Sequence, residues 1–132
     1  MKKITLLLVI IFTFLFSTTS WGEWNYVVEG MNDVKFYYDK DRVRKSGKYL
    51  YFWTLQDLVK PNEYGDLSLT SYFQLDCSIF RYKDLKGQSY KNSMGEGKMT
   101  GEWTPKGEQG EWKYPKPNSS GEFMLNKICE EH

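Results

Sequence analysis

The sequence predicts an α+β domain, in which an antiparallel β-sheet carries one C-terminal α-helix that a disulfide ties to one face of the sheet. Three observations lead to this prediction. Aromatic residues make up 17% of the chain, and their large side chains favour strands over helices. Cys77 falls on the apolar side of an alternating segment that is typical of a strand. Cys129 falls on the apolar side of a C-terminal helix. The two thiols can therefore meet if the helix lies across the sheet.

Three strands are expected in the first half of the chain. They are runs of apolar residues between turn-forming residues, and they cover 24–29, 34–39 and 48–58. Aromatic and aliphatic side chains occupy both faces of the third run at first, which is typical of a central strand covered at least in part on both sides. A turn at Ser46 and Gly47 precedes this strand, and a loop rich in Pro, Asn and Gly follows it.

A further strand is expected over residues 71–82, where apolar and polar residues alternate. One face of this strand carries Phe73, Leu75, Cys77 and Ile79. Because successive side chains of a strand point to opposite faces, Cys77 is expected to point toward the core.

The chain becomes more polar beyond Gly87. A strand over 89–93 is expected there, followed by glycine-rich turns over 94–110. The tripeptide Gly-Glu-Trp occurs at 101–103 and again at 110–112. Two tripeptides are too short to indicate a structural repeat, so they reflect either chance or the two arms of a hairpin.

The C-terminal segment predicts a linker followed by a helix. Two prolines in 114–118 exclude a central strand there and favour an extended linker. Ser119 and Glu122 form a capping box, so a helix is expected to begin there and to reach about Cys129. Leu125 lies one turn before Cys129, which puts the thiol on an apolar helix face.

Residues 1–22 are predicted to be a removable signal peptide, leaving a single domain over 23–132. Two lysines precede an uncharged apolar run over 4–16. A helix of that length spans only about 20 Å, against about 30 Å for the hydrocarbon core of a bilayer, so no permanent membrane anchor is expected, and a retained anchor is the alternative. Small residues before the cleavage point favour cleavage between Gly22 and Glu23.

An exported chain with only two cysteines, Cys77 and Cys129, is expected to form a disulfide. A reactive thiol and a metal-binding pair are the alternatives. A metal site needs more ligands, and the only histidine is the terminal residue His132.

Charge and size restrict the possible functions. The formal net charge is +1, and it becomes −1 if Lys2 and Lys3 leave with the leader. Such a balance disfavours a nucleic-acid partner, and a domain of this size excludes a two-domain enzyme. The candidate contacts for an acidic protein or an anionic glycan are one basic cluster and two exposed tryptophans: Lys40, Arg42, Arg44, Lys45, Lys48, Trp103 and Trp112. A solvated hairpin end and a small aromatic core are the alternatives for these two groups.

No catalytic apparatus is evident in the sequence, and no enzymatic activity or cofactor is expected. Asp39 and Asp41, with Glu63 or Asp76, offer carboxylates for acid–base catalysis, but solvated charges at strand ends account for them equally. A serine or cysteine nucleophile needs a nearby histidine, and the terminal residue His132 is the only candidate. A small carboxylate-dependent periplasmic hydrolase remains one alternative to a binding domain. A structural envelope protein that dimerises through its sheet edges is another.

Several short motifs occur in a characteristic order along the chain. They are Tyr38-Asp39 before a basic stretch, Trp53-x-Leu55, Asp76-Cys77 leading to Arg81, Met94-Gly95-x-Gly97, and Trp112 followed by Pro117-Asn118-Ser119 and a last helix with Cys129. In this order they resemble the bacterial surface-adhesin protein E-like domain family. The resemblance implies a sheet of about six antiparallel strands with the terminal helix disulfide-tethered to one face.

The resemblance also implies a function. The family is named for an outer-membrane adhesin that binds host matrix proteins, which implies an exported, non-enzymatic binding domain with a protein or glycan partner. No cysteine stands at the end of the apolar run, where a lipid anchor would be attached. A periplasmic or secreted protein is therefore expected at least as readily as one associated with the cell surface, and a homodimer is compatible with either location.

Overall fold

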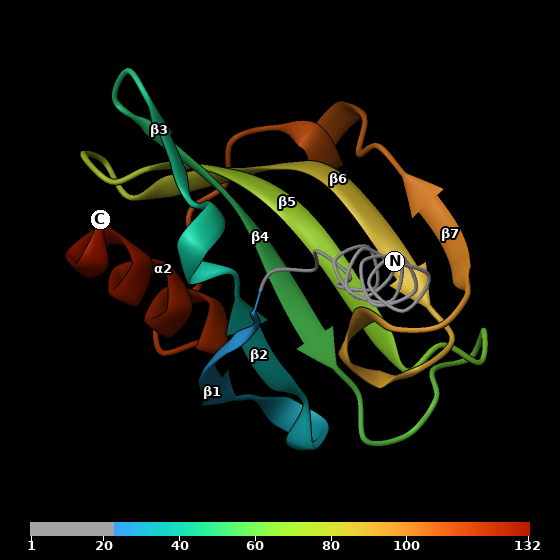
Figure 1. Cartoon of the computed structure of the whole chain (residues 1–132). Coiled ribbons are helices and arrows are strands. Elements are labelled where there is room, and N and C mark those ends of the chain that lie inside the picture. The colour runs from blue at the N-terminus through green and yellow to red at the C-terminus, as the bar shows by residue number, and fades with distance from the viewer. Residues whose placement is uncertain (1–22) are drawn as a thin grey trace, which may run out of the picture.

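The computed structural model describes residues 23–132, which form one antiparallel sheet and one long helix (Figure 1). The predicted signal peptide lies outside the described residues. Along the sheet the strand order is β1 (Asn25–Glu29), β2 (Lys35–Tyr38), β4 (Tyr49–Asp57), β5 (Ser68–Asp76), β6 (Arg81–Tyr90) and β7 (Met99–Trp103). The short strand β3 (Arg44–Ser46) pairs with the beginning of β4. The predicted fold class is therefore confirmed.

Short 3-10 turns connect several of the strands. They are η1 (Met31–Asp33), η2 (Lys40–Arg42), η3 (Ser93–Gly95) and η4 (Gly107–Gly110). Within 23–132 there is no helix whose length and apolar character would let it cross a membrane.

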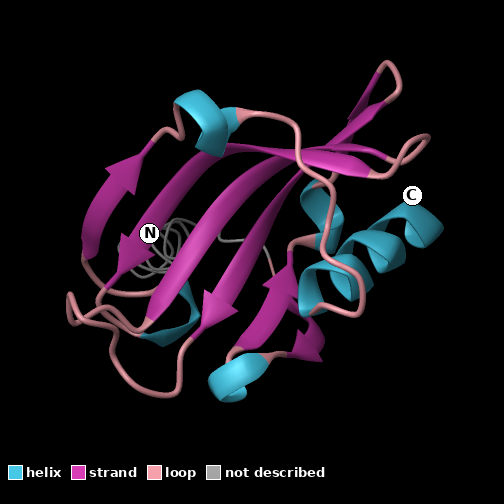
Figure 2. Ribbon diagram, turned by 180° about the vertical axis from the view of Figure 1, so that it is seen from behind, coloured by secondary structure: helices cyan, strands magenta, loops and turns pink. Residues whose placement is uncertain are grey.

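The helix α2 (Ser120–Glu131) covers one face of the sheet on the side of β1 and β2, and leaves β6 and β7 uncovered (Figures 1 and 2). The core lies between this helix and the sheet. It consists of Tyr38, Leu50, Phe52 and Leu75 from the strands and Met124, Leu125 and Ile128 from the helix. We call this side of the sheet the helix-covered face and the other side the helix-free face.

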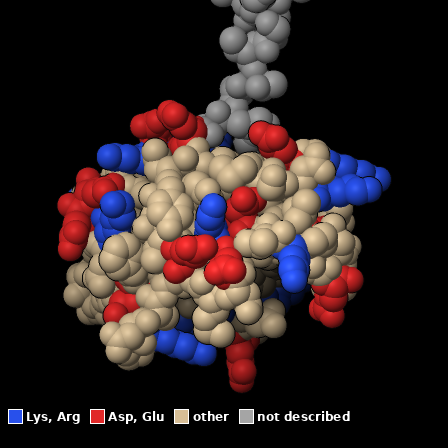
Figure 3. Space-filling view, turned by 90° about the horizontal axis from the view of Figure 1, so that it is seen from below, with Lys and Arg blue, Asp and Glu red and all other residues tan. Residues whose placement is uncertain are grey.

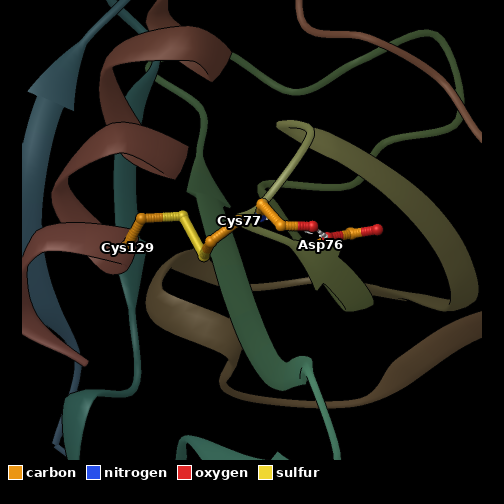
Figure 4. Close-up of a disulfide and its surroundings, with 4 residues drawn as sticks. Asp76, Cys77 and Cys129 are labelled. Carbon is orange, nitrogen blue, oxygen red and sulfur yellow. Dashed lines mark hydrogen bonds between the residues drawn. A yellow bond between two sulfur atoms is a disulfide. The ribbon is translucent and has the colours of Figure 1, made fainter.

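The predicted capping box and disulfide are both confirmed. Ser119 Oγ accepts a hydrogen bond from the Glu122 amide at 3.1 Å, and Glu122 Oε1 accepts one from the Asn118 amide at 3.1 Å. The first bond satisfies an amide that the first helical turn leaves without a partner, and the second holds the amide of the residue just before the cap. Cys77 joins Cys129 with 5.9 Å between their Cα atoms. Figure 4 shows Cys77 turned toward the helix and Asp76 turned the other way.

The opposite end of α2 is fixed by a polar contact. The buried Tyr38 hydroxyl donates a hydrogen bond to the carboxylate of Glu131. Burial raises the pKa of Tyr38 above its ordinary value, and the bond from Tyr38 holds the pKa of Glu131 below its own. Both groups therefore keep the protonation states that this hydrogen bond needs at neutral pH.

The single strand predicted over 71–82 is wrong. The chain turns back after Asp76, so β5 and β6 form a hairpin with a tight connection at 77–80. Phe80 adopts a left-handed φ of 53° in this turn. Ile79, predicted to face the core, is 49% exposed because it lies in the turn.

The polar second half contains more strand than the sequence indicated. The strand predicted over 89–93 is only the end of β6, and β7 lies inside the predicted run of turns. The two Gly-Glu-Trp segments are not arms of one hairpin, because 101–103 pairs with β6 in β7. The second copy ends beside an isolated bridge between Tyr82 and Lys113.

Candidate binding surface

Cross-strand register brings aromatic and basic side chains together on the helix-free face. One row runs across four strands as Arg44, Tyr51, Gln74 and Lys83. Residues that pair in register lie on the same face, so these four side chains share the surface opposite α2. Gln74 Nε2 donates a hydrogen bond to the Tyr51 hydroxyl at 3.1 Å, which fixes the middle of the row.

A neighbouring row contains Tyr49, Asp76 and Arg81. Trp112, from the loop before the linker, packs beside this row. Its ring centroid lies 5.5 Å from that of Tyr49 and 4.3 Å from Arg81 Cζ. Lys83 Nζ lies 5.4 Å from the same indole centroid, so Trp112 has two cations over its ring. Such cation–π contacts contribute about 0.5–1 kcal/mol each at exposed sites.

The beginning of β4 repeats this arrangement. Arg44 Cζ lies 5.2 Å from the Tyr51 centroid, and Lys48 Nζ lies 5.4 Å from the Tyr49 centroid. We define the aromatic–basic face as Arg44, Lys48, Tyr49, Tyr51, Arg81, Lys83 and Trp112.

Further along the helix-free face, aromatic side chains continue the surface. The Trp53 and Tyr72 rings lie 5.0 Å apart, and Tyr72 also stacks at 6.3 Å from Tyr51. All three rings are half-buried. Trp53 and Tyr72 therefore extend the aromatic–basic face along the sheet, and part of each ring stays accessible.

The only carboxylate in the two rows is neutralised from within. Asp76 is buried and accepts hydrogen bonds from the Ser78 amide (3.1 Å) and hydroxyl (2.5 Å), and Arg81 Nε lies 3.4 Å away. The Ser78 hydroxyl bond does most to hold the pKa of Asp76 below its ordinary value, against the opposing effect of burial. Arg81 is thus positioned by Asp76 to lie beneath Trp112.

Three cations of this surface form no ion pair within the described residues, although the charge of Lys48 helps to hold the pKa of Asp76 below its ordinary value. Arg44, Lys48 and Lys83 take part in none of the ion pairs formed within 23–132. The face therefore carries a net positive charge although the whole chain is nearly neutral. By contrast, Figure 3 shows basic and acidic groups interspersed over the end of the molecule seen from below.

The sequence-predicted contact residues do not form one cluster. Arg44, Lys48 and Trp112 come together on the aromatic–basic face. Lys45 pairs with Leu50 in register and so belongs to the opposite side of the sheet. Trp103 pairs with Gly87, also on that opposite side.

Two other members of the basic cluster have acidic partners. Arg42 Nε lies 2.5 Å from the buried Asp39, and Lys40 Nζ lies 4.0 Å from Glu131 at the end of α2. The side chains of Lys40 and Arg42 are both exposed, but the carboxylates of Glu131 and Asp39 partly offset their charges. They belong to the attachment of η2 and α2 rather than to the aromatic–basic face.

Sequence reasoning did not place Arg81 and Lys83 among the contact residues, because the predicted strand ended at residue 82 and β6 was not recognised as a strand of its own. The one available signal was the alternation of basic and aromatic residues in Arg81-Tyr82-Lys83, at the beginning of β6. Alternation of this kind predicts a half-buried strand.

The structure places two of the four candidate acids for catalysis in ion pairs and leaves the other two, Asp41 and Glu63, exposed at the surface. Asp39 faces Arg42, and Asp76 faces Arg81. Burial raises the pKa of Asp84, but this carboxylate lies 3.6 Å from Lys113 Nζ rather than beside a second acid. Among residues 23–132 no group of three or more His, Cys, Asp or Glu side chains is arranged to hold a metal ion.

Comparison with known proteins gives one family and a set of related structures. The family described as Surface-adhesin protein E matches residues 24–130. Crystal form II of Haemophilus influenzae protein E is 17% identical, with a TM-score of 0.61, over 86% of this chain and 91% of that chain. Another structure of Haemophilus influenzae protein E is 16% identical, with a TM-score of 0.58, over 86% and 88% of the two chains. At these identities the structures show a shared fold. No curated protein sequence matches the chain.

Proposed function

The chain belongs to the surface-adhesin protein E family, and from that premise we propose that it is an exported, adhesin-like binding protein without enzymatic activity. Its partner is an anionic glycan or an acidic protein surface. The contact surface is the aromatic–basic face. The protein acts in the periplasm, outside the cell or at the cell surface, as the family name and the predicted leader suggest.

The observation that carries this proposal is the set of cations that lie over aromatic rings and form no ion pair within the part of the chain that the structure describes. Arg44, Lys48 and Lys83 are held by ring contacts rather than by carboxylates. The ring contacts thus favour these positions before a partner arrives, while the charges remain available to it. Preorganised cations pair with carboxylate or sulfate groups at a lower entropic cost than free side chains.

The rings add a second kind of contact. Tyr49, Tyr51 and Trp112 are half-buried, so each presents part of a rigid apolar surface next to a polar hydroxyl or indole N–H. Tyrosine and tryptophan are enriched where proteins bind partners for this reason. A partner that combines acidic groups with apolar surface would match the face in both respects.

The experiment is a pull-down with the exported protein, performed with host extract and separately with its own cell envelope. The test variant combines Arg44→Gln and Lys83→Gln. Lys45→Gln is the matched control, because Lys45 adjoins Arg44 in the same exposed strand but lies on the other side of the sheet. We expect the double variant to bind the captured partner about tenfold more weakly and with less dependence on salt.

Equal binding by the double variant and the control would contradict the proposal. Recovery of a partner only from the envelope would favour a role inside the bacterium over adhesion to host material.

The sheet edges support a second candidate, a structural protein that dimerises. β1 and β7 are the outer strands, and β7 exposes Met99 and Trp103 by 45% each. An exposed edge strand can pair with another chain. A measurement of molecular mass in solution distinguishes this candidate, since it requires a dimer even without a ligand.

A further inference from the structure

A separate groove lies on the other side of the sheet, beyond the area that α2 covers. Its volume is about 510 Å³, and it is lined by the loop around Tyr64 and Asp66, by Ser89 of β6, and by Thr100 and Trp103 in β7. Grooves of this size accommodate small ligands. The lining contains no lysine or arginine, and its second carboxylate, Glu102, is paired with Lys86 at 3.4 Å.

Asp66 is held rigidly at this groove. It is 4% exposed, and its amide donates a hydrogen bond to Asn62 Oδ1 at 2.9 Å. Thr100 Oγ1 donates a hydrogen bond of 2.5 Å to Asp66 Oδ1. Ser89 Oγ lies 2.9 Å from Thr100 Oγ1. Because an ionised carboxylate can only accept, Thr100 must donate to Asp66 and therefore receives its own hydrogen bond from Ser89.

The other carboxylate oxygen, Oδ2, receives no hydrogen bond from residues 23–132. Among the described residues, only Asp39 Oδ1 is a side-chain oxygen that is both fully enclosed and without a hydrogen-bond partner. Asp66 Oδ2 has no such partner either, so it is not fully enclosed. Asp66 thus lines the groove with one carboxylate oxygen that has no hydrogen-bond partner among the described residues.

Asp66 differs in this respect from the other buried carboxylates of the described chain. Asp39 and Asp76 each have an arginine partner. Asp66 takes part in none of the ion pairs within 23–132. A buried charge without an opposite charge is costly, and a cationic ligand in the groove would offset that cost.

Two aromatic side chains line the same groove. Tyr64 is 79% exposed, and Trp103 is 45% exposed. Trp103 packs directly on the backbone of Gly87, where an added Cβ would meet the indole at 2.2 Å. Glycine at this position therefore lets the ring lie close against the strand. Aromatic faces next to a carboxylate attract organic cations.

We infer that this groove binds an alkylammonium group, supplied by a free amine or by a lysine side chain of another protein. The ammonium would donate a hydrogen bond to Asp66 Oδ2 and lie against the rings of Tyr64 and Trp103. A neutral hydroxyl compound could occupy the same volume, but it would leave the charge of Asp66 without an opposite charge. The groove and the aromatic–basic face lie on opposite sides of the sheet. An experiment that refutes binding at one site therefore leaves the proposal for the other site untouched.

The test is a calorimetric titration of the exported protein with cadaverine, with 1,5-pentanediol as the neutral compound of similar length. A short lysine peptide and its Nε-acetylated form distinguish the source of the amine. The variants are Asp66→Asn, which keeps an acceptor for Thr100, and Tyr64→Ala, which changes an exposed side chain. Tyr114→Ala is the matched control, because Tyr114 is 67% exposed and does not line the groove.

We expect cadaverine to bind and pentanediol not to bind. Asp66→Asn should weaken cadaverine binding about tenfold or more and Tyr64→Ala about threefold, while Tyr114→Ala leaves it unchanged. Stronger binding of the lysine peptide than of cadaverine, lost on acetylation, would assign the groove to a protein lysine. Equal binding of pentanediol, no cadaverine binding by the unaltered protein, or an unchanged affinity in Tyr64→Ala would overturn the inference. If Asp66→Asn fails to fold, the Tyr64→Ala result decides.

Discussion

Replacing both Cys77 and Cys129 by alanine should destabilise the domain by about 4 kcal/mol. The disulfide closes a loop with a sequence separation of 52 residues. In the loop-entropy account, opening a loop of that length gives the unfolded chain roughly 14 cal/mol/K of additional entropy, which is about 4 kcal/mol at 25 °C. For a domain of this size, unfolding entropy is about 0.2 kcal/mol/K, so Tm should fall by about 15 to 20 °C.

Thermal and urea denaturation of the two proteins, each with and without a thiol reductant, measure this effect. The reductant should lower the Tm of the unaltered protein toward that of the alanine variant and leave the variant unchanged. The m-value should rise when the link is absent, because the unfolded chain becomes more extended. The reasoning is refuted if titration shows both thiols free in the reduced protein and its Tm is unchanged.

Three other substitutions test separate parts of the structure. Asp76→Asn should lower the free energy of unfolding at pH 7 and make it depend less on acid. The pKa of Asp76 is lower in the folded protein than its ordinary value, so its contribution to stability is complete above the unfolded pKa of about 4 and is lost as pH falls through the lower folded value. Urea denaturation from pH 7 to 3 would show this. Ser119→Ala removes the acceptor at the beginning of α2 and should cost about 1 kcal/mol in the same assay. Gly87→Ala should displace the Trp103 ring, cost about 1 to 3 kcal/mol and shift tryptophan fluorescence to longer wavelength; an unchanged emission spectrum would contradict this packing.

The parts of the fold that local chemistry determines could be predicted from the sequence. The capping box at Ser119 begins the helix where expected, and the two cysteines pair as expected. The aromatic run of β4 is central, lying between β2 and β5. Its second face is covered in part, as expected: η3 packs against β4 and Leu55 is fully buried there, while Tyr49, Tyr51 and Trp53 on the same face are half-buried.

The hairpin at 77–80 was not predicted, because Asp76 and Ser78, whose hydrogen bonds form its turn, also fit the polar face of the alternation. No glycine, proline or asparagine occurs in Cys77-Ser78-Ile79-Phe80, and Phe80 takes the left-handed conformation that glycine normally supplies. The alternation of β5 continues through these residues by coincidence. Periodicity alone therefore extended the strand past its real end at Asp76.

The binding surface was only partly predictable for a related reason. Sequence proximity grouped Lys40 to Lys48 as one cluster, but the turn η2 and the pairing of β3 distribute these side chains over different sides of the sheet. Arg81, Lys83 and Trp112 join Arg44 and Lys48 only through the register of β6 and the return of the loop before the linker. Such long-range pairing is not encoded in any short motif.

The most direct test of the central claim is to map the surface that the captured partner covers. Amide chemical shifts of the labelled protein, followed during titration with that partner, report contacts residue by residue. The account predicts that the largest changes fall on Arg44, Tyr51 and Lys83 and that Lys45 and the exposed side of α2 stay unchanged. Changes confined to α2, or to the groove at Tyr64, would contradict it.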